Sequence, residues 1–231
     1  MLRVSSLRKS YGKVQAVRGV SFSLEKGRTT ALLGENGAGK TTTLKIILGF
    51  LRQDSGTVET SARRIGYVPD HPMYLPWLNG KTVLDLTGRM SGISGLKWSA
   101  RVRRLCDRIL FDPALLERKP VTYSAGNAKK FACLQSLAIA PDLLVVDEPF
   151  SALDPPAIKR IRELFAEIRD EGASILLSSH LLAEMVRTSD DFIVIRRGEV
   201  VASSGLPEFL SRFRPQGAEE LESAFLGLMQ G

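Results

Sequence analysis

The amino-acid sequence predicts an α/β fold in which buried strands alternate with helices, and three observations support it. Residues 143–146 form an uninterrupted apolar run, which is typical of a parallel strand covered on both faces. Apolar residues then recur at helical spacing over 158–168, and Gly172 follows them. Earlier in the chain, the apolar run 31–33 leads through a glycine-rich loop into helical spacing over 44–51. This alternation predicts helices layered on a sheet, with ligands bound at the carboxyl ends of the strands.

The remaining elements are shorter. Apolar and polar residues alternate over 17–24, which predicts a strand that ends at a turn over 25–27. We expect a second turn at 54–56. Further short strands are expected at 65–68, 174–177 and 192–195.

The segment of about residues 70–140 differs in character from its flanks. Apolar residues such as Val102, Leu105 and Ile109 recur there at helical spacing. Residues 101–130 hold eight Lys or Arg against three acidic residues. We interpret this segment as a helical subdomain inserted into the α/β core.

Composition limits the class of protein. Of the 231 residues, 44% are hydrophobic and 25% are charged, which is ordinary for a globular protein and argues against a disordered chain. The net charge of +7 suits an anionic partner, namely nucleic acid, a phosphate-rich ligand or the cytoplasmic face of a membrane. No apolar run approaches the roughly 18 residues that a membrane-spanning helix needs, and the N-terminus does not resemble a signal peptide. The two cysteines, Cys106 and Cys133, predict neither a disulfide scaffold nor a zinc site. We therefore expect a cytoplasmic protein.

A phosphate-binding loop is the most specific motif. Residues 34–41, GENGAGKT, fit the pattern GxxxxGK[ST] and lie between a predicted strand and a predicted helix, as that pattern requires. Glycines let backbone N–H groups converge on phosphate oxygens, and the helix dipole adds positive potential. Lys40 is expected to reach the β- and γ-phosphates and to assist catalysis, and the Thr41 hydroxyl to bind Mg²⁺. The predicted nucleotide-binding residues of this loop are Gly34, Asn36, Gly37, Gly39, Lys40, Thr41 and Thr42.

A pair of carboxylates follows the apolar run 143–146. Asp147 is expected to hold the shell of a Mg²⁺ ion, and Glu148 to orient and deprotonate the attacking water. Acidic residues at a strand end are often only solvated. Together with the glycine-rich loop, however, the pair predicts a site that hydrolyses a nucleotide.

The chain resembles the ATP-binding subunit of an ABC transporter over nearly its full length. The order and spacing of six motifs carry this resemblance: GENGAGKT, IGYVPD, YSAGN, LLVVDEP, SALD and LLSSH. The resemblance implies a P-loop NTPase core of the RecA-like type, with an N-terminal antiparallel β subdomain and the inserted helical signature subdomain. It also implies a single ATPase domain over residues 1–231, with ATP and Mg²⁺ as cofactors.

The resemblance further implies roles for two isolated residues and one loop. Tyr11 would stack on adenine, although by itself it also fits a tyrosine at a strand edge. His180 would contact the γ-phosphate and position the water, although a lone histidine is usually structural. Residues 151–154, SALD, resemble the loop that crosses to the partner subunit in a dimer.

The signature motif departs from the family pattern. Where the family usually has LSGGQ, residues 123–127 are YSAGN. Ser124 and Gly126 are retained, so a hydroxyl and a backbone N–H at a helix start remain available to phosphate. Ala125 adds a methyl group where the backbone should approach closely, and Asn127 shortens the amide. Without its context, this segment would be no more than a helix cap.

Asp70 is a second departure, because the family usually has glutamine or sometimes glutamate at this position. The resemblance implies that this residue senses Mg²⁺ and links the nucleotide to the membrane partner. An aspartate can still bind a metal through water, so we expect an effect on coupling more than on chemistry.

The leading hypothesis is an ATP-hydrolysing subunit that dimerises around Mg-ATP and drives a separate transmembrane permease, with an exporter favoured over an importer. Its partners would be that permease and a second ATP-binding subunit, identical or different, at the inner face of the plasma membrane, with no nucleic acid. One alternative is a soluble ABC ATPase that acts on nucleic acid or ribosomes, which the positive charge would suit. Another is a nucleotide-binding regulatory subunit that does not hydrolyse. Residues 215–231 are expected to form an amphipathic tail that packs on the core or on a partner.

Overall fold

A computed structural model describes residues 1–213, and the predicted tail over 215–231 lies outside the described residues. The chain divides into two compact units. The first combines residues 1–61 with the chain from Ser174 onward, and the second comprises residues 62–173. Across residues 1–213, no helix combines the length and the apolar character that crossing a bilayer requires. Each unit contains some of the predicted site residues.

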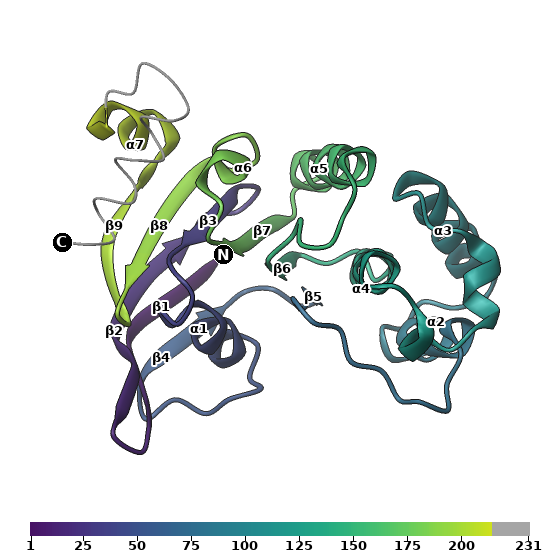
Figure 1. Cartoon of the computed structure of the whole chain (residues 1–231), viewed down its shortest axis with the longest axis horizontal. Coiled ribbons are helices and arrows are strands. Elements are labelled where there is room, and N and C mark those ends of the chain that lie inside the picture. Colours follow the sequence, from purple (N-terminus) through teal and green to yellow (C-terminus); the bar gives the residue numbers. More distant parts are fainter. Residues whose placement is uncertain (214–231) are drawn as a thin grey trace. The chain divides into compact units, whose positions relative to one another are not determined.

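The first unit contains an antiparallel sheet with strand order β2-β1-β4 (Figure 1). Its strands are β1 (Leu2–Tyr11), β2 (Val14–Leu24) and β4 (Ser55–Thr60). Leu2, Val4 and Leu7 of β1 are buried between more exposed residues, as expected for a sheet with one face on a core, and the change from even to odd positions falls at a register shift between Val4 and Leu7. Gly12, at a φ of 58°, makes the tight turn that joins β1 to β2. This sheet is the N-terminal antiparallel β subdomain that the family resemblance implied.

The first unit also contains a mainly parallel set of strands in the order β7-β3-β8-β9. The strand β3 pairs in parallel with β7 on one side and with β8 on the other, and β9 is antiparallel to β8. All residues of β3 and β7 are buried, as the apolar runs predicted. The bounds are β3 (Thr29–Leu33), β7 (Ser174–Ser179), β8 (Asp191–Arg196), β9 (Glu199–Gly205), α1 (Lys40–Ile47), α6 (Leu182–Val186) and α7 (Leu206–Phe213).

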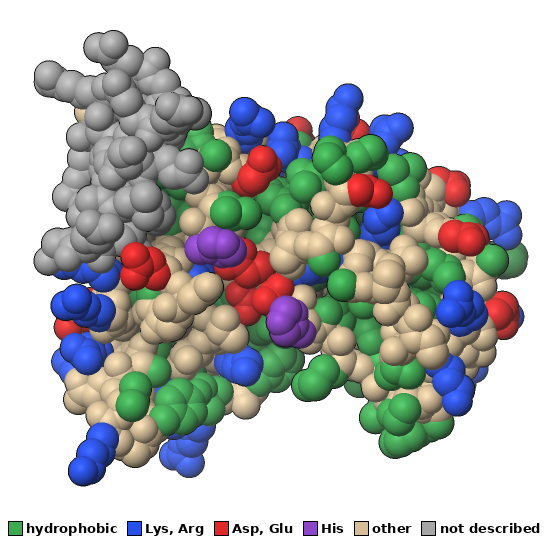
Figure 2. Space-filling view, in the orientation of Figure 1, with side chains coloured by type: hydrophobic (Ala, Val, Ile, Leu, Met, Phe, Trp, Pro, Cys, Tyr) green, Lys and Arg blue, Asp and Glu red, His purple; other side chains and the backbone are tan. Residues whose placement is uncertain are grey.

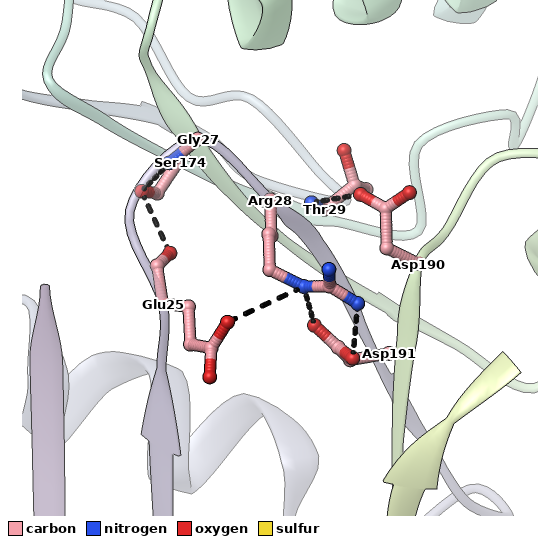
Figure 3. Close-up of polar contacts among 7 residues, drawn as sticks. All are labelled: Glu25, Gly27, Arg28, Thr29, Ser174, Asp190 and Asp191. Carbon is pink, nitrogen blue, oxygen red and sulfur yellow. Dashed lines mark hydrogen bonds and ion pairs between the residues drawn. The ribbon is translucent and has the colours of Figure 1, made fainter. Parts of the chain in front are cut away.

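Polar contacts join the amino ends of β3, β7 and β8 (Figure 3). The Arg28 guanidinium donates two hydrogen bonds to the Asp191 carboxylate, at 2.6 and 2.7 Å. The neighbouring carboxylate of Asp190 accepts the backbone N–H of Thr29 at 2.8 Å, and the Ser174 hydroxyl accepts the N–H of Gly27 at 3.1 Å. Parallel strands that are aligned at their amino ends also end together. These contacts therefore help to place the carboxyl ends of β3 and β7, where the glycine-rich loop begins and His180 lies.

The second unit contains two parallel strands and most of the helices (Figure 1). Its elements are β5 (Ile65–Val68), β6 (Leu143–Asp147), α2 (Gly80–Met90), α3 (Gly95–Arg108), α4 (Ala125–Ala138), α5 (Pro155–Asp170) and two short 3₁₀ helices (Pro113–Glu117 and Pro120–Thr122). The ring of Phe131 on α4 is fully buried and contacts the rings of Tyr74, Phe111 and Tyr123. The predicted helical subdomain of about 70–140 falls within this unit, which begins earlier and also includes β6 and α5.

Basic residues are distributed over the surface. On the face drawn in Figure 2, Lys and Arg side chains lie scattered among acidic, polar and hydrophobic ones. The net charge of +7 therefore forms no single basic patch on that face. This face therefore differs from the broad basic surface that typically binds a nucleic acid backbone.

Candidate functional site

The glycine-rich loop begins where β3 ends. The N–H of Gly34 donates to the carbonyl of Ser179, the last residue of β7, at 3.3 Å. A Cβ atom on Gly34 would lie 2.5 Å from the carbonyl oxygen of Ile195 in β8, a distance that real Cβ atoms do not adopt. Only glycine fits here, because the loop starts in contact with the backbone of both neighbouring strands.

Two further glycines shape the loop through positive φ angles. Gly37 has a φ of 82° and Gly39 a φ of 104°, in the region that favours glycine. A Cβ atom on Gly39 would also lie 2.5 Å from the carbonyl oxygen of Ala16, whereas one on Gly37 would meet nothing within 4 Å. Gly39 is also the N-cap of α1, so the N-cap residue itself has no side chain over the start of the helix. The N–H groups at a helix start and the positive end of the helix dipole together suit an anion such as phosphate.

The Lys40 side chain lies over this loop. Lys40 is only 6% exposed, and its ammonium group donates to the carbonyl oxygens of Gly34 at 2.6 Å and Glu35 at 3.2 Å. Thr41 and Thr42 follow in the first turn of α1, where Thr41 is exposed. The loop therefore combines backbone donors, a lysine and a hydroxyl, and this donor set fits a nucleotide phosphate with its Mg²⁺ ion.

Tyr11 and His180 lie at strand ends of the same unit. Tyr11 closes β1, is 51% exposed, and has the Lys9 ammonium 5.9 Å from its ring centroid. An exposed ring of this kind can stack on a base. His180 directly follows β7 and is exposed. Both residues thus have the exposure that their predicted contacts with a nucleotide require.

In the second unit, the carboxylate pair ends β6. Asp147 is its last residue and is only 3% exposed. Glu148 follows with a φ of 50°, a left-handed conformation that is uncommon for a residue with a side chain. The Glu148 carbonyl accepts the N–H of Ser151 at 3.3 Å, and the Ser151 hydroxyl lies 3.1 Å from the same oxygen. Strained backbone of this kind persists where its surroundings hold it, and it is concentrated at functional sites. The carboxylate oxygens of Asp147 are also the ligand type that Mg²⁺ prefers.

Asp70 follows β5, and its carboxylate has protein partners. The oxygen Oδ1 accepts the Ser151 hydroxyl at 2.8 Å and lies 3.7 Å from the ammonium group of Lys129. The oxygen Oδ2 lies 3.6 Å from Nδ1 of His71. The proposed contact of Asp70 with a magnesium shell stays a prediction, and the sequence analysis did not identify the contact between Lys129 and Asp70. The available signal was the position of Lys129 one helical turn before the apolar residues Ala132 and Cys133 of α4.

The signature segment lies at the start of α4. Ser124 is the N-cap, and its hydroxyl oxygen accepts the N–H of Asn127 at 3.3 Å, so the cap that the sequence suggested is present. Ser124 and Ala125 are both exposed. A Cβ atom on Gly126 would lie 2.8 Å from the carbonyl oxygen of Ala152. Glycine at this position therefore lets the start of α4 approach the backbone of the SALD loop.

Comparison with known proteins identifies the family. A family model described as "ABC transporter" matches residues 17–151, more than half of the chain. The chain belongs to the ABC transporter family. The uncharacterised ABC transporter ATP-binding protein YxlF of Bacillus subtilis is 34% identical over 90% of this chain and 72% of YxlF. The Nod factor export ATP-binding protein I of Ralstonia nicotianae is 34% identical over 91% of this chain and 69% of that protein. A solved ATP binding subunit of an ABC transporter matches with a TM-score of 0.90 and 30% identity over the full length of both chains.

These similarities confirm the predicted family, its P-loop α/β fold, and the function of an ATP-binding and ATP-hydrolysing transport subunit that uses ATP and Mg²⁺. The predicted site residues of this ABC protein divide between its two units. The first unit holds Tyr11, the loop residues 34–42 and His180. The second holds Asp70, Ser124, Gly126, Asp147 and Glu148. The roles of the individual residues stay predictions.

Proposed function

We propose that this chain binds ATP through the glycine-rich loop and drives a separate transmembrane permease by hydrolysing it. The glycine-rich loop at the start of α1 carries this proposal, because Gly37 and Gly39 have positive φ angles and the Lys40 ammonium group lies over the loop carbonyls. Gly34, Asn36, Gly37 and Thr42 would surround the phosphates with backbone and side-chain donors. Lys40 would exchange its two loop carbonyls for phosphate oxygens, which are better partners because they are charged. Tyr11 would stack on the adenine ring.

The hydrolytic step would depend on Glu148 and His180. Thr41 and Asp147, with Asp70 through water, would hold Mg²⁺, which supplies charge neutralisation on the β- and γ-phosphates. Glu148 would accept the proton of the attacking water, and its left-handed backbone conformation would set the direction of that carboxylate. His180, exposed at the end of β7, would contact the γ-phosphate and position the water.

A second ATP-binding subunit would complete each site. Ser124 and Gly126 lie at the start of α4, where the helix dipole favours an anion. We propose that they contact the nucleotide bound by the opposite subunit, so that ATP holds the two subunits together. The exposure of Ser124 in the single chain supports this arrangement, because its hydroxyl is accessible to a partner.

The membrane partner places the subunit at the inner face of the plasma membrane. An export role is favoured because the Nod factor protein, which covers most of this chain, is named for export. The absence of a single basic patch on the face in Figure 2 does not favour nucleic acid as the alternative partner.

Purification from membranes in mild detergent tests the proposal. We expect a polytopic membrane protein to co-purify with the wild type and to remain bound to the Glu148→Gln variant. The recovered complex should hydrolyse ATP in the wild type only. Co-purification of ribosomes or DNA in place of a membrane protein would contradict the permease assignment.

A further inference from the structure

The ammonium group of Lys129 lies at the centre of a polar network in the second unit. Lys129 is 1% exposed, although it sits on α4 beside the apolar residues that fill the core. Its Nζ atom donates to the carbonyl oxygens of Pro69 and Asp147, both at 3.0 Å, and lies 3.7 Å from Oδ1 of Asp70. Burial lowers the pKa of this lysine, while the carboxylates of Asp70, Asp147 and Glu148 oppose that shift. Burying a charged group is costly, so an apolar residue would serve packing alone at least as well.

The two carbonyl contacts join segments that are distant in sequence. Pro69 follows β5 and Asp147 ends β6, so one side chain from α4 holds the carboxyl ends of both strands. The carbonyl of Asp147 belongs to the peptide group that directly precedes Glu148. A hydrogen bond from Lys129 to that carbonyl therefore restricts rotation of the peptide plane next to Glu148, where the backbone has a φ of 50°.

Ser151 holds the peptide group on the other side. Its N–H donates to the carbonyl of Glu148, and its hydroxyl donates to Oδ1 of Asp70 at 2.8 Å. The same carboxylate oxygen of Asp70 faces Lys129. The peptide groups before and after Glu148 are thus both anchored, and Asp70 connects the two anchors.

We propose that Lys129 is a positioning residue for Glu148, acting through the carbonyl of Asp147, and that Asp70 acts as its counter-ion and as the acceptor for Ser151. This inference rests on the hydrolytic role proposed for Glu148. It assigns Asp70 a function within its own chain that does not require a bound metal. Lys129 touches neither the nucleotide nor the water in this account.

Kinetic and stability measurements on a set of variants test the proposal. Lys129→Met keeps an unbranched side chain that is one atom shorter and removes its charge and donors, and Asp70→Asn removes the negative charge at nearly constant size. Lys130→Met is the matched control, because Lys130 is the next residue on α4 and donates to the carbonyl of Leu110 outside the network. Three measurements are made on each full-length variant. They are the kcat and KM of ATP hydrolysis, the ATP affinity by calorimetry, and the midpoint of thermal unfolding without nucleotide.

We expect Lys129→Met to lower kcat at least about tenfold while KM and ATP affinity change less than about twofold. Lys130→Met should leave kcat within about twofold. In the Glu148→Gln background, Lys129→Met should lower kcat no further, because Lys129 acts only through Glu148. Asp70→Asn should lower both kcat and the unfolding midpoint in the wild type, and its effect on each should be clearly smaller in the Lys129→Met background.

Three results would overturn the inference. One is an unchanged kcat in Lys129→Met, and another is a loss in kcat that persists at full size in the Glu148→Gln background. The third is an equal effect of Asp70→Asn with and without Lys129, which would show that Asp70 does not act through Lys129. If Lys129→Met does not fold, the single variants Asp70→Asn and Ser151→Ala and their double variant replace it. The effects of these two substitutions on kcat should be non-additive. Strictly additive effects would refute the network. Normal hydrolysis by Glu148→Gln alone would instead refute the proposed role of Glu148.

Discussion

Replacing Gly39 or Gly37 by alanine separates two reasons why the glycine-rich loop needs glycine. Both residues have a positive φ, 104° and 82°, so alanine at either position should cost about 1–2 kcal/mol in backbone strain. Only at Gly39 would the new methyl group also lie 2.5 Å from a backbone oxygen, that of Ala16, while at Gly37 it would meet open space. Overpacking of this kind costs about 1–3 kcal/mol more. The sum of the backbone strain and the overpacking predicts that Gly39→Ala is destabilised by about 2–5 kcal/mol in total.

Thermal unfolding without nucleotide measures this difference. For a chain of this size, 1 kcal/mol corresponds to about 2–4 °C in the unfolding midpoint. The midpoint of Gly39→Ala should thus lie about 2–12 °C below that of Gly37→Ala, because only the overpacking distinguishes the two variants. Gly37→Ala is the matched control, since it lies in the same loop. Equal midpoints for the two variants, or a higher midpoint for Gly39→Ala, would refute the explanation that the methyl group at position 39 is overpacked.

Further predictions concern the base, acid stability and the signature. Tyr11→Ala should weaken ATP binding by about 1–3 kcal/mol in calorimetry, and Tyr11→Phe should bind nearly as the wild type does; normal affinity of the alanine variant would exclude stacking. Hydrogen bonds from the backbone N–H groups of residues 64 and 63 lower the pKa of Asp142 in the folded state. The Asp142 carboxylate therefore stabilises the fold above its unfolded pKa of about 3.9, and this stabilisation is lost as the pH falls through the lower folded pKa. Asp142→Asn should lower the unfolding midpoint at pH 7. The midpoint of this variant should also fall less steeply in acid than that of the wild type. An acid decline as steep as that of the wild type would argue against this role. Ala125→Gly combined with Asn127→Gln should raise ATP hydrolysis by the isolated subunit, and equal turnover in the wild type would show that the signature changes are harmless.

Local sequence patterns were sufficient where one physical signal dominates. The apolar run 143–146 could only be buried on both faces, and it forms β6 with every residue buried. The glycine-rich loop was equally clear, because its glycines and lysine have a fixed spacing between a strand and a helix. For such elements the local chemistry already determines the structure.

Other features depend on partners that are distant in sequence. Residues 54–56 were expected to form a turn, but β4 begins at Ser55, and Gly56 has a φ of 91° within it. A Cβ atom on Gly56 would lie 2.5 Å from the carbonyl oxygen of Ser6 in β1, so this glycine permits a close approach of the two strands. The local pattern correctly indicated a special role for glycine here, but the predicted turn was wrong because Ser55 and Gly56 belong to the strand β4. The register of a sheet is set by its partner strand, which a local pattern does not contain.

The candidate site shows the same division. Its motifs named the residues of the loop, the carboxylate pair and the signature, since these have characteristic local spacing. The network around Lys129 was not identifiable, because Pro69, Asp70 and Asp147 are contacted from a helix that lies between them in the sequence. The left-handed backbone of Glu148 was likewise not predictable, as nothing in its residue type favours a positive φ.

ATP turnover by Glu148→Gln, measured beside its ATP affinity, is the most direct test of the central claim that this subunit hydrolyses ATP with Glu148 as its base. The substitution keeps the size of the side chain and leaves the glycine-rich loop and Lys40 in place. The account predicts a loss of at least about 100-fold in steady-state turnover, the scale of a general base, with ATP affinity unchanged by calorimetry. Turnover equal to that of the wild type would contradict the claim.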